Sequence, residues 1–113
     1  MDSRTVLLFT RDGLGQGPEA LQKTLANKFL NLLLESGELP AKILFYTDGV
    51  KLACKGSDVI DVLTGMKDKG VELILCKTCL DSYGLSDSVE VGIIGGMPDI
   101  IQAMQKAEKV ISL

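Results

Sequence analysis

The sequence predicts an α/β fold of three layers, in which helices cover both faces of a mostly parallel five-stranded sheet with Rossmann-like topology. Two observations support this. Short apolar runs alternate with segments of helical periodicity along the whole chain, as expected of successive βαβ units. The 113 residues, 46% of them hydrophobic, are enough to form one core without disulfides or a metal. We therefore expect a single domain over residues 1–113.

The first half of the chain contains the clearest elements. A strand is expected over Thr5–Phe9, followed by a glycine-rich loop over residues 10–17. Pro18 suits the first position of a helix, where its missing N–H costs nothing. Apolar residues then recur at helical spacing as far as Gly37, which ends the pattern. A second strand follows over residues 41–46.

The second half continues the alternation. Ser57 and Asp58 resemble the N-cap of a helix that ends at Gly70, and a third apolar strand ends at Cys76. The remaining elements are a strand over residues 89–94, a turn at 95–96, a helix over 98–107 and a closing strand over 109–113.

Composition excludes several classes of function. The formal net charge of −3 and the pI near 4.8 provide no field that would attract nucleic acid or an anionic membrane. The apolar stretch Val6–Phe9 is too short for a signal peptide or a membrane span, so we expect a cytoplasmic protein. The chain has no histidine, which excludes Ser-His-Asp and Cys-His catalysis.

Three loops should meet at one edge of the sheet. Right-handed crossovers bring the segments after parallel strands to the same edge, here residues 10–17, 47–56 and 76–84. The first contributes Asp12 and glycines, and the second contributes Lys51. The third carries a pair of cysteines, so these loops could form one site.

The cysteine pair is the main candidate for chemistry. Cys76 and Cys79 follow a buried strand and precede a helical turn, with Lys77 between them. Free backbone N–H groups and a nearby cation both favour the thiolate, the form in which cysteine is a nucleophile. We therefore expect Cys76 to be accessible and substantially deprotonated.

Cysteine pairs also occur in metal sites and in dithiol exchange. Zinc needs about four ligands, and one pair plus a remote Cys54 without histidine does not supply them, so we expect no metal. A thioredoxin-like dithiol remains an alternative, although no tryptophan precedes the pair and the chain opens with a glycine loop and a long helix. Cys54 alone is best interpreted as a small buried hydrophobe.

The glycine loop raises a different class of function. Gly13, Gly15 and Gly17 lie between a strand and a helix, and Asp48 ends the second strand, as in a dinucleotide site. The spacing is not Gly-x-Gly-x-x-Gly, and no phosphate-loop motif is present. Turns that need positive φ explain the glycines equally well, and we expect no cofactor.

Three blocks resemble a known family. They are Asp12-Gly13-Leu14-Gly15-Gln16-Gly17, Gly49-Val50-Lys51-Leu52 and Cys76-Lys77-Thr78-Cys79-Leu80-Asp81-Ser82-Tyr83-Gly84-Leu85. They are similar to the DsrE/DsrF-like superfamily, and more closely to the carboxyl-terminal domain of YedF-type proteins, which are sulfurtransferase-like and linked to selenium metabolism. The resemblance implies a DsrE-like α/β fold, a cytoplasmic setting and assembly into homo-oligomers. It implies that Cys76 accepts sulfur as a persulfide and that Cys79 resolves or releases it.

The resemblance also implies partners. YedF-type proteins commonly carry an amino-terminal TusA-like domain, and nothing here precedes the first strand, so we expect sulfur or selenium to come from a separate protein such as a TusA-like carrier or a cysteine desulfurase. The hypothesis is a persulfide carrier or sulfurtransferase with Cys76 and Cys79 as catalytic residues. A thiol-disulfide redox protein and a non-catalytic oligomeric module that binds a small molecule or nucleotide remain alternatives. The candidate substrate-binding residues are Asp12, Gly13, Gly15, Lys51 and Lys77; no catalytic role is assigned to Asp12.

Overall fold

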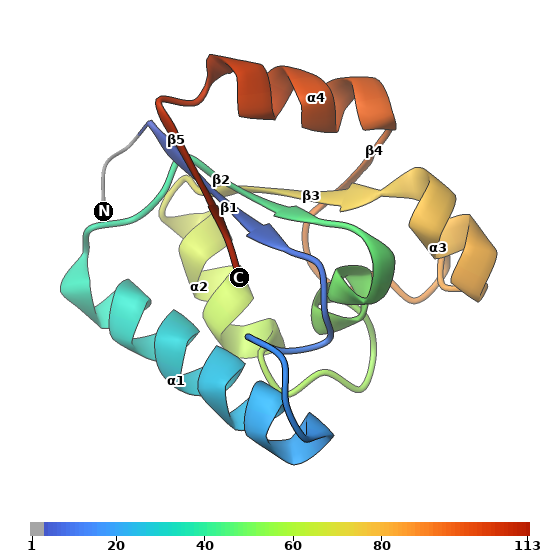
Figure 1. Ribbon diagram of the computed structural model, residues 1–113, viewed down its shortest axis with the longest axis horizontal. Coiled ribbons are helices and arrows are strands. Elements are labelled where there is room, and N and C mark those ends of the chain that lie inside the picture. The colour runs from blue at the N-terminus through green and yellow to red at the C-terminus, as the bar shows by residue number, and fades with distance from the viewer. Residues whose placement is uncertain (1–3) are drawn as a thin grey trace.

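The computed structural model describes residues 4–113, so the first three residues of the predicted domain lie outside it. Five strands form one sheet in the order β4-β3-β2-β1-β5, and every neighbouring pair is parallel. Helices α1 and α2 cover one face and α4 covers the other, which confirms the predicted three layers (Figure 1). The strands are β1 (Thr5–Phe9), β2 (Lys42–Phe45), β3 (Glu72–Cys76), β4 (Ile93–Gly95) and β5 (Lys109–Ser112). The helices are α1 (Glu19–Ser36), α2 (Ile60–Asp68), α3 (Lys77–Tyr83) and α4 (Met97–Lys106).

The three central strands are buried along nearly their whole length. A parallel strand between two helical layers has no solvent face, so it is a continuous apolar run rather than an alternating one. The rings of Phe9 and Phe45, the last residues of β1 and β2, stack at 5.8 Å between centroids. This apolar contact closes the core directly beneath the edge where the strands end.

Helix α1 ends as predicted. Gly37 adopts a left-handed conformation with φ 72°, which a residue without a Cβ reaches at little cost, and its N–H donates to the carbonyl of Leu34. Within residues 4–113, no helix has the combination of length and apolar composition that crossing a membrane requires.

Two predicted boundaries were wrong. The first turn of α2 begins at Ile60 with Val59 as N-cap, whereas the sequence placed the cap at Ser57 and Asp58. The Ser57 hydroxyl does accept the Val59 N–H at 3.2 Å, so it organises the turn before the helix.

The fourth strand is also shorter than the predicted 89–94. Val89 forms only an isolated antiparallel bridge with Cys54, and the N–H groups of Glu90 and Val91 donate to the carbonyl of Ala53. Because these donors are already satisfied, β4 begins only at Ile93. The partner segment is a 3₁₀ helix, η1 (Thr47–Ala53), where the sequence predicted a loop.

Candidate functional site

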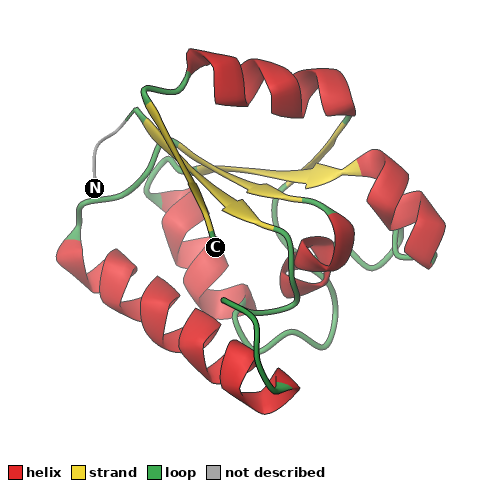
Figure 2. Cartoon of the chain, in the orientation of Figure 1, coloured by secondary structure: helices red, strands yellow, loops and turns green. Residues whose placement is uncertain are grey.

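The ends of three strands meet at one edge of the sheet, as predicted. The loop after β1, the helix η1 after β2 and the helix α3 after β3 all lie at this edge (Figure 2). Hydrogen bonds join the three segments directly: Thr47 of η1 contacts Thr10 on one side and Cys79 on the other.

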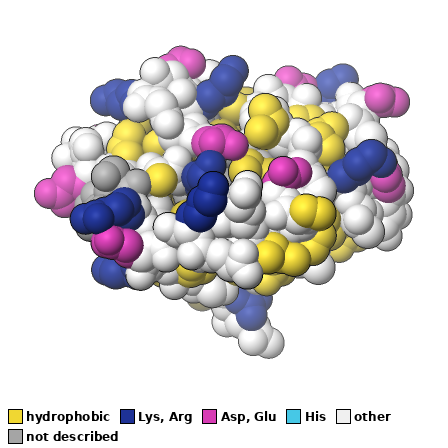
Figure 3. All heavy atoms as spheres, turned by 90° about the horizontal axis from the view of Figure 1, so that it is seen from above, with side chains coloured by type: hydrophobic (Ala, Val, Ile, Leu, Met, Phe, Trp, Pro, Cys, Tyr) yellow, Lys and Arg dark blue, Asp and Glu magenta, His cyan; other side chains and the backbone are white. Residues whose placement is uncertain are grey.

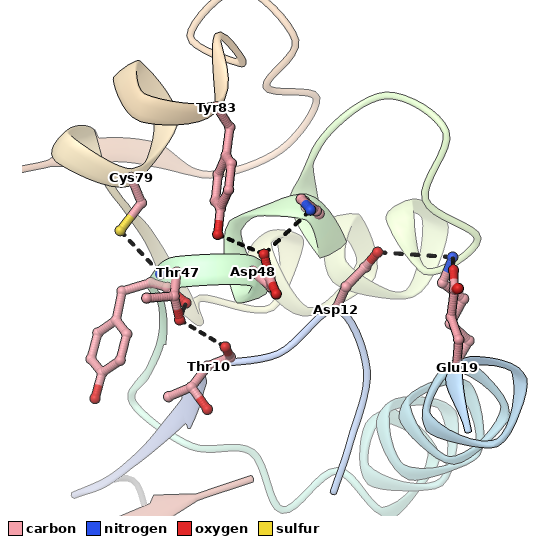
Figure 4. Close-up of polar contacts among 10 residues, drawn as sticks. Thr10, Asp12, Glu19, Thr47, Asp48, Cys79 and Tyr83 are labelled. Atoms are coloured by element: carbon pink, nitrogen blue, oxygen red, sulfur yellow. Dashed lines mark hydrogen bonds and ion pairs between the residues drawn. The ribbon is translucent and has the colours of Figure 1, made fainter. Parts of the chain in front are cut away.

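Thr47 has an unusual backbone conformation that positions these contacts. Its φ is +48°, the only positive value at a non-glycine residue within residues 4–113, and such values are rare for β-branched side chains. Its Oγ1 donates to the Thr10 carbonyl at 2.8 Å, and its N–H points at the Cys79 Sγ at 3.0 Å (Figure 4). A backbone donor aimed at a sulfur stabilises negative charge on that sulfur.

The two cysteines of the pair differ in accessibility. Cys76, the last residue of β3, is 1% exposed and pairs with Gly95 of β4, so the prediction that its sulfur is accessible was wrong. Cys79, one turn into α3, is half-buried. Both are free thiols. The sulfur within reach of solvent is therefore that of Cys79.

The electrostatic setting of Cys79 also differs from the prediction. Burial raises the pKa of the Cys79 thiol, the Thr47 N–H opposes this rise, and a hydrogen bond that the Cys79 thiol donates to Cys76 adds to it. The net direction is upward, and no lysine contributes. The pKa of the Cys79 thiol in this chain is thus raised, and the cation expected beside the cysteine pair takes no part in setting it.

The two lysines among the predicted substrate-binding residues both contact acidic side chains and not the thiols. Lys77 forms an ion pair with Asp81 at 2.7 Å, one turn along the exposed face of α3. Lys51 lies 3.3 Å from Asp48, and its Nζ stands 4.7 Å from the centre of the Tyr83 ring.

Sequence reasoning missed one polar group at this edge. The Tyr83 hydroxyl donates to Asp48 Oδ1 at 2.6 Å (Figure 4). This bond, together with Lys51, lowers the pKa of Asp48, and the same bond raises the pKa of Tyr83. The signal was present in the spacing, because residues four apart on a helix share a face and Tyr83 lies four after Cys79.

The glycines of the loop after β1 allow its turn and its close packing against α1. A Cβ on Gly13 would lie 2.7 Å from the carbonyl carbon of Gln22, so only glycine allows this approach to α1, and Gly15 has φ +76°. Asp12 is half-buried with its carboxylate 3.8 Å from Lys23; burial raises the pKa of Asp12 more than that lysine lowers it.

Beside these groups is a cavity of about 370 Å³. Its lining includes Asp12 and Lys51 but not Gly13, Gly15 or Lys77, so the structure brings together only two of the five predicted substrate-binding residues there. Cys54, 2% exposed, lies in its wall. Within residues 4–113, no group of three or more Cys, Asp or Glu side chains is arranged to hold a metal ion.

Comparisons with known proteins place this fold. The solved structures that resemble it include the YchN protein from E. coli, with a TM-score of 0.73, 20% identity and 100% of both chains covered. They also include MTH1491 from Methanobacterium thermoautotrophicum, with a TM-score of 0.71, 17% identity and coverage of 99% of this chain and 100% of that one. A further one is BT1422 from Bacteroides thetaiotaomicron, with a TM-score of 0.69, 13% identity and coverage of 97% of this chain and 95% of that one. At these identities the likeness shows the fold alone. A comparison with curated proteins gave no match.

The sequence itself matches a family description. The DsrE/DsrF-like family matches over residues 5–113, which is nearly the whole chain. The closer likeness to YedF-type proteins stays a prediction. The five-stranded fold and this match agree with each other, and the protein belongs to the DsrE/DsrF-like family.

Proposed function

We propose that this protein is a cytoplasmic sulfur carrier that holds a sulfane sulfur as a persulfide on Cys79. The observation that carries the proposal is the half-exposed Cys79 sulfur, which accepts a backbone N–H at 3.0 Å and has a second thiol beside it. Membership of a family associated with sulfur relay supports it.

The roles of the two cysteines are the reverse of those predicted from sequence. An incoming protein persulfide must reach the receiving sulfur in line with its S–S bond, and a side chain that is 1% exposed does not allow this approach. Cys79 is therefore the receiving residue and Cys76 the resolving one.

The transfer step conserves atoms and charge. Cys79 Sγ attacks the outer sulfur of a donor persulfide, a bond forms between them, and the donor S–S bond breaks. The proton lost by Cys79 passes to the departing donor thiolate, so the products are a Cys79 persulfide and the donor thiol. The raised pKa of Cys79 keeps the resting thiol protonated, and the Thr47 N–H stabilises the negative charge that develops on Sγ during attack.

Release can follow two routes. An acceptor thiolate can attack the outer sulfur and take it as its own persulfide, which regenerates Cys79. Alternatively, the Cys76 thiolate attacks Cys79 Sγ, which forms a disulfide between them and expels hydrosulfide. The second route leaves an oxidised protein that an external dithiol must reduce.

The predicted homo-oligomer remains part of this proposal. Apolar side chains are exposed on the edge strand β4 and on α4, among them Ile93, Ile94, Met97 and Ile101. Figure 3, which views the α4 side, shows apolar side chains lying between charged ones. Such a surface is compatible with self-association.

Intact-mass analysis under non-reducing conditions tests the proposal. After incubation with a cysteine desulfurase and L-cysteine, we expect the protein to gain one sulfur atom. Cys79→Ser should abolish the gain, whereas Cys76→Ser should retain it and slow hydrosulfide release; Cys54→Ser is the matched control and should behave as wild type. Loss of two hydrogens without a gain of sulfur would instead indicate dithiol exchange, and loading that survives Cys79→Ser would refute the assignment of Cys79.

A further inference from the structure

The cavity beside the thiol site is formed by segments far apart in the sequence. The loop after β1 contributes Asp12, α1 contributes Lys23, and η1 contributes Lys51. The turn before α2 adds Lys55 and Asp58. Three lysines therefore gather at one hollow of a protein whose net charge is −3.

The charges of this cavity are only partly compensated within the chain. Lys23 lies 3.0 Å from Glu19, and Lys51 lies 3.3 Å from Asp48. In the part of the chain that the structure describes, the charged groups of Lys55 and Asp58 form no hydrogen bond or ion pair. One cation and one carboxylate thus remain available three residues apart, although the charge of Asp58 acts on Lys23 from beyond ion-pair distance.

The cavity also has an apolar part and a suitable size. Leu52, Cys54 and Leu85 contribute to its wall, and its volume of about 370 Å³ lies within the range of roughly 300–1,000 Å³ typical of small-molecule sites. A few polar groups at fixed positions around an apolar surface are the usual composition of such sites.

We propose that this cavity binds a zwitterionic small molecule of the amino-acid class. The ligand carboxylate lies near Lys55 and Lys51, its ammonium group lies near Asp58 and Asp12, and a short apolar or thiol side chain packs against Leu52 and Leu85. This site is separate from the persulfide chemistry of Cys79 and does not depend on it.

The same charges disfavour the alternative ligands. A nucleotide or another polyanion would bring several negative charges against Asp12 and Asp58, of which only Asp12 has a lysine within 4 Å. Gly13 and Gly15, the two glycines among the predicted substrate-binding residues, do not line the cavity. A ligand that carries only a positive charge would be repelled by the three lysines that line the cavity. Only a ligand with both charges satisfies the two unpaired groups together.

The test is an NMR titration of the ¹⁵N-labelled full chain with L-2-aminobutyrate. This amino acid has the size of cysteine but carries a methyl group in place of the reactive thiol. We expect the amide signals of residues 51–58 to shift in a saturable way. Butyrate lacks the ammonium group and propylamine lacks the carboxylate, so each should bind at least tenfold more weakly. Lys55→Gln and Asp58→Asn should each weaken binding at least fivefold.

Matched controls separate this result from general charge effects. Lys77→Gln removes a lysine that does not line the cavity and should bind L-2-aminobutyrate like wild type. The proposal is overturned if the signals do not shift at tens of millimolar, if inorganic phosphate or butyrate binds as tightly as L-2-aminobutyrate, or if Asp58→Asn strengthens binding. The spectra of the variants report their folding in the same experiment.

Discussion

The sulfur site and the lysine-lined cavity lie along the same edge of the sheet. The first has an accessible sulfur without a nearby cation, whereas the second has three lysines and a buried cysteine. Around Cys79 the contacts are a backbone N–H, a second thiol and apolar surroundings, and no lysine contributes to its pKa. Three lysines line the cavity, but Cys54 in its wall is only 2% exposed. The difference shows that no cation lowers the pKa of the Cys79 thiol in this chain, and that the N–H of Thr47 is the group that does so.

Helix η1 joins the two regions, because Thr47 reaches the sulfur site and Lys51 reaches the cavity. Gly49→Ala should therefore disrupt both. A Cβ at position 49 would lie 2.6 Å from the carbonyl carbon of Phe9, against backbone that cannot move aside. We expect a loss of at least about 3 kcal/mol in the free energy of unfolding, measured by urea denaturation.

Gly17→Ala provides the matched glycine control. A Cβ there would lie 3.7 Å from a methyl group of Leu21, an ordinary contact, so its unfolding midpoint should stay near that of wild type. Equal stability of Gly49→Ala and wild type would show that η1 can shift without harm.

Alkylation with iodoacetamide compares the three sulfurs directly. Cys79 should react about 100-fold or more faster than Cys76 and Cys54 in the native protein, because the two buried thiols must wait for local opening. Peptide mass mapping after a timed quench measures the rates, and a denatured sample in which the three rates converge is the control. Faster reaction of Cys76 would restore the roles predicted from sequence.

The sequence predicted the sheet well because of the environment of its strands. Strands buried on both faces are continuous apolar runs, and handedness places their following loops at one edge, so β1, β2 and β3 and the meeting of their loops were all predictable. The same burial explains the error at Cys76. As the last residue of a strand covered on both sides, it shares the burial of β3 instead of the exposure of the loop.

Other features could not be predicted from spacing. The positive φ of Thr47 depends on the Thr10 carbonyl, 37 residues away in the sequence, and the cavity depends on side chains from several segments. Lys77 was predicted to favour the thiolate form of the cysteines because it lies between them in the sequence. In the helix it lies one turn from Asp81 and pairs with that residue on the exposed face.

Variants of Thr47 test the role of its peptide group. Thr47→Val keeps a branched side chain at positive φ but loses the hydroxyl bond to Thr10 that holds this conformation, so we expect a cost of about 1–3 kcal/mol. As the N–H loses its alignment, the pKa of Cys79 should rise further, which the pH dependence of alkylation measures. Thr47→Gly keeps the N–H and accepts the same φ, so it should retain a pKa nearer to wild type. Equal pKa values in all three proteins would contradict the role of this N–H.

The hydrogen bond between Tyr83 and Asp48, which lies between the two regions, should contribute to stability in a pH-dependent way. Because the pKa of Asp48 is lowered, mainly by Tyr83, the stability from this bond is present above the unfolded aspartate pKa and is lost as pH falls through the folded one. Because the pKa of Tyr83 is raised, the stability from this bond is also lost as pH rises through the pKa of Tyr83 in the folded protein. The difference in Tm between wild type and Tyr83→Phe should be small and constant from about pH 5 to 9, and should shrink below about pH 4.

Tyr46→Phe is the control for this profile, since its hydroxyl forms no hydrogen bond to another residue in the described range 4–113. It should show no pH-dependent difference from wild type. A Tyr83→Phe profile parallel to wild type down to pH 3 would mean that the Asp48 bond is not maintained in solution.

The smallest expected effect is that of Lys77→Gln, and it sharpens the comparison most. If cations activated the sulfur, removing the lysine that lies between the two cysteines in the sequence would raise the pKa of Cys79 and slow its alkylation at neutral pH. Because Lys77 is held by Asp81 at 2.7 Å and does not contribute to the pKa of Cys79, we expect the alkylation profile to remain that of wild type. A pKa that rose in Lys77→Gln as much as in Thr47→Val would return the activating role to the side chain, and the peptide group would then be only a positioning element.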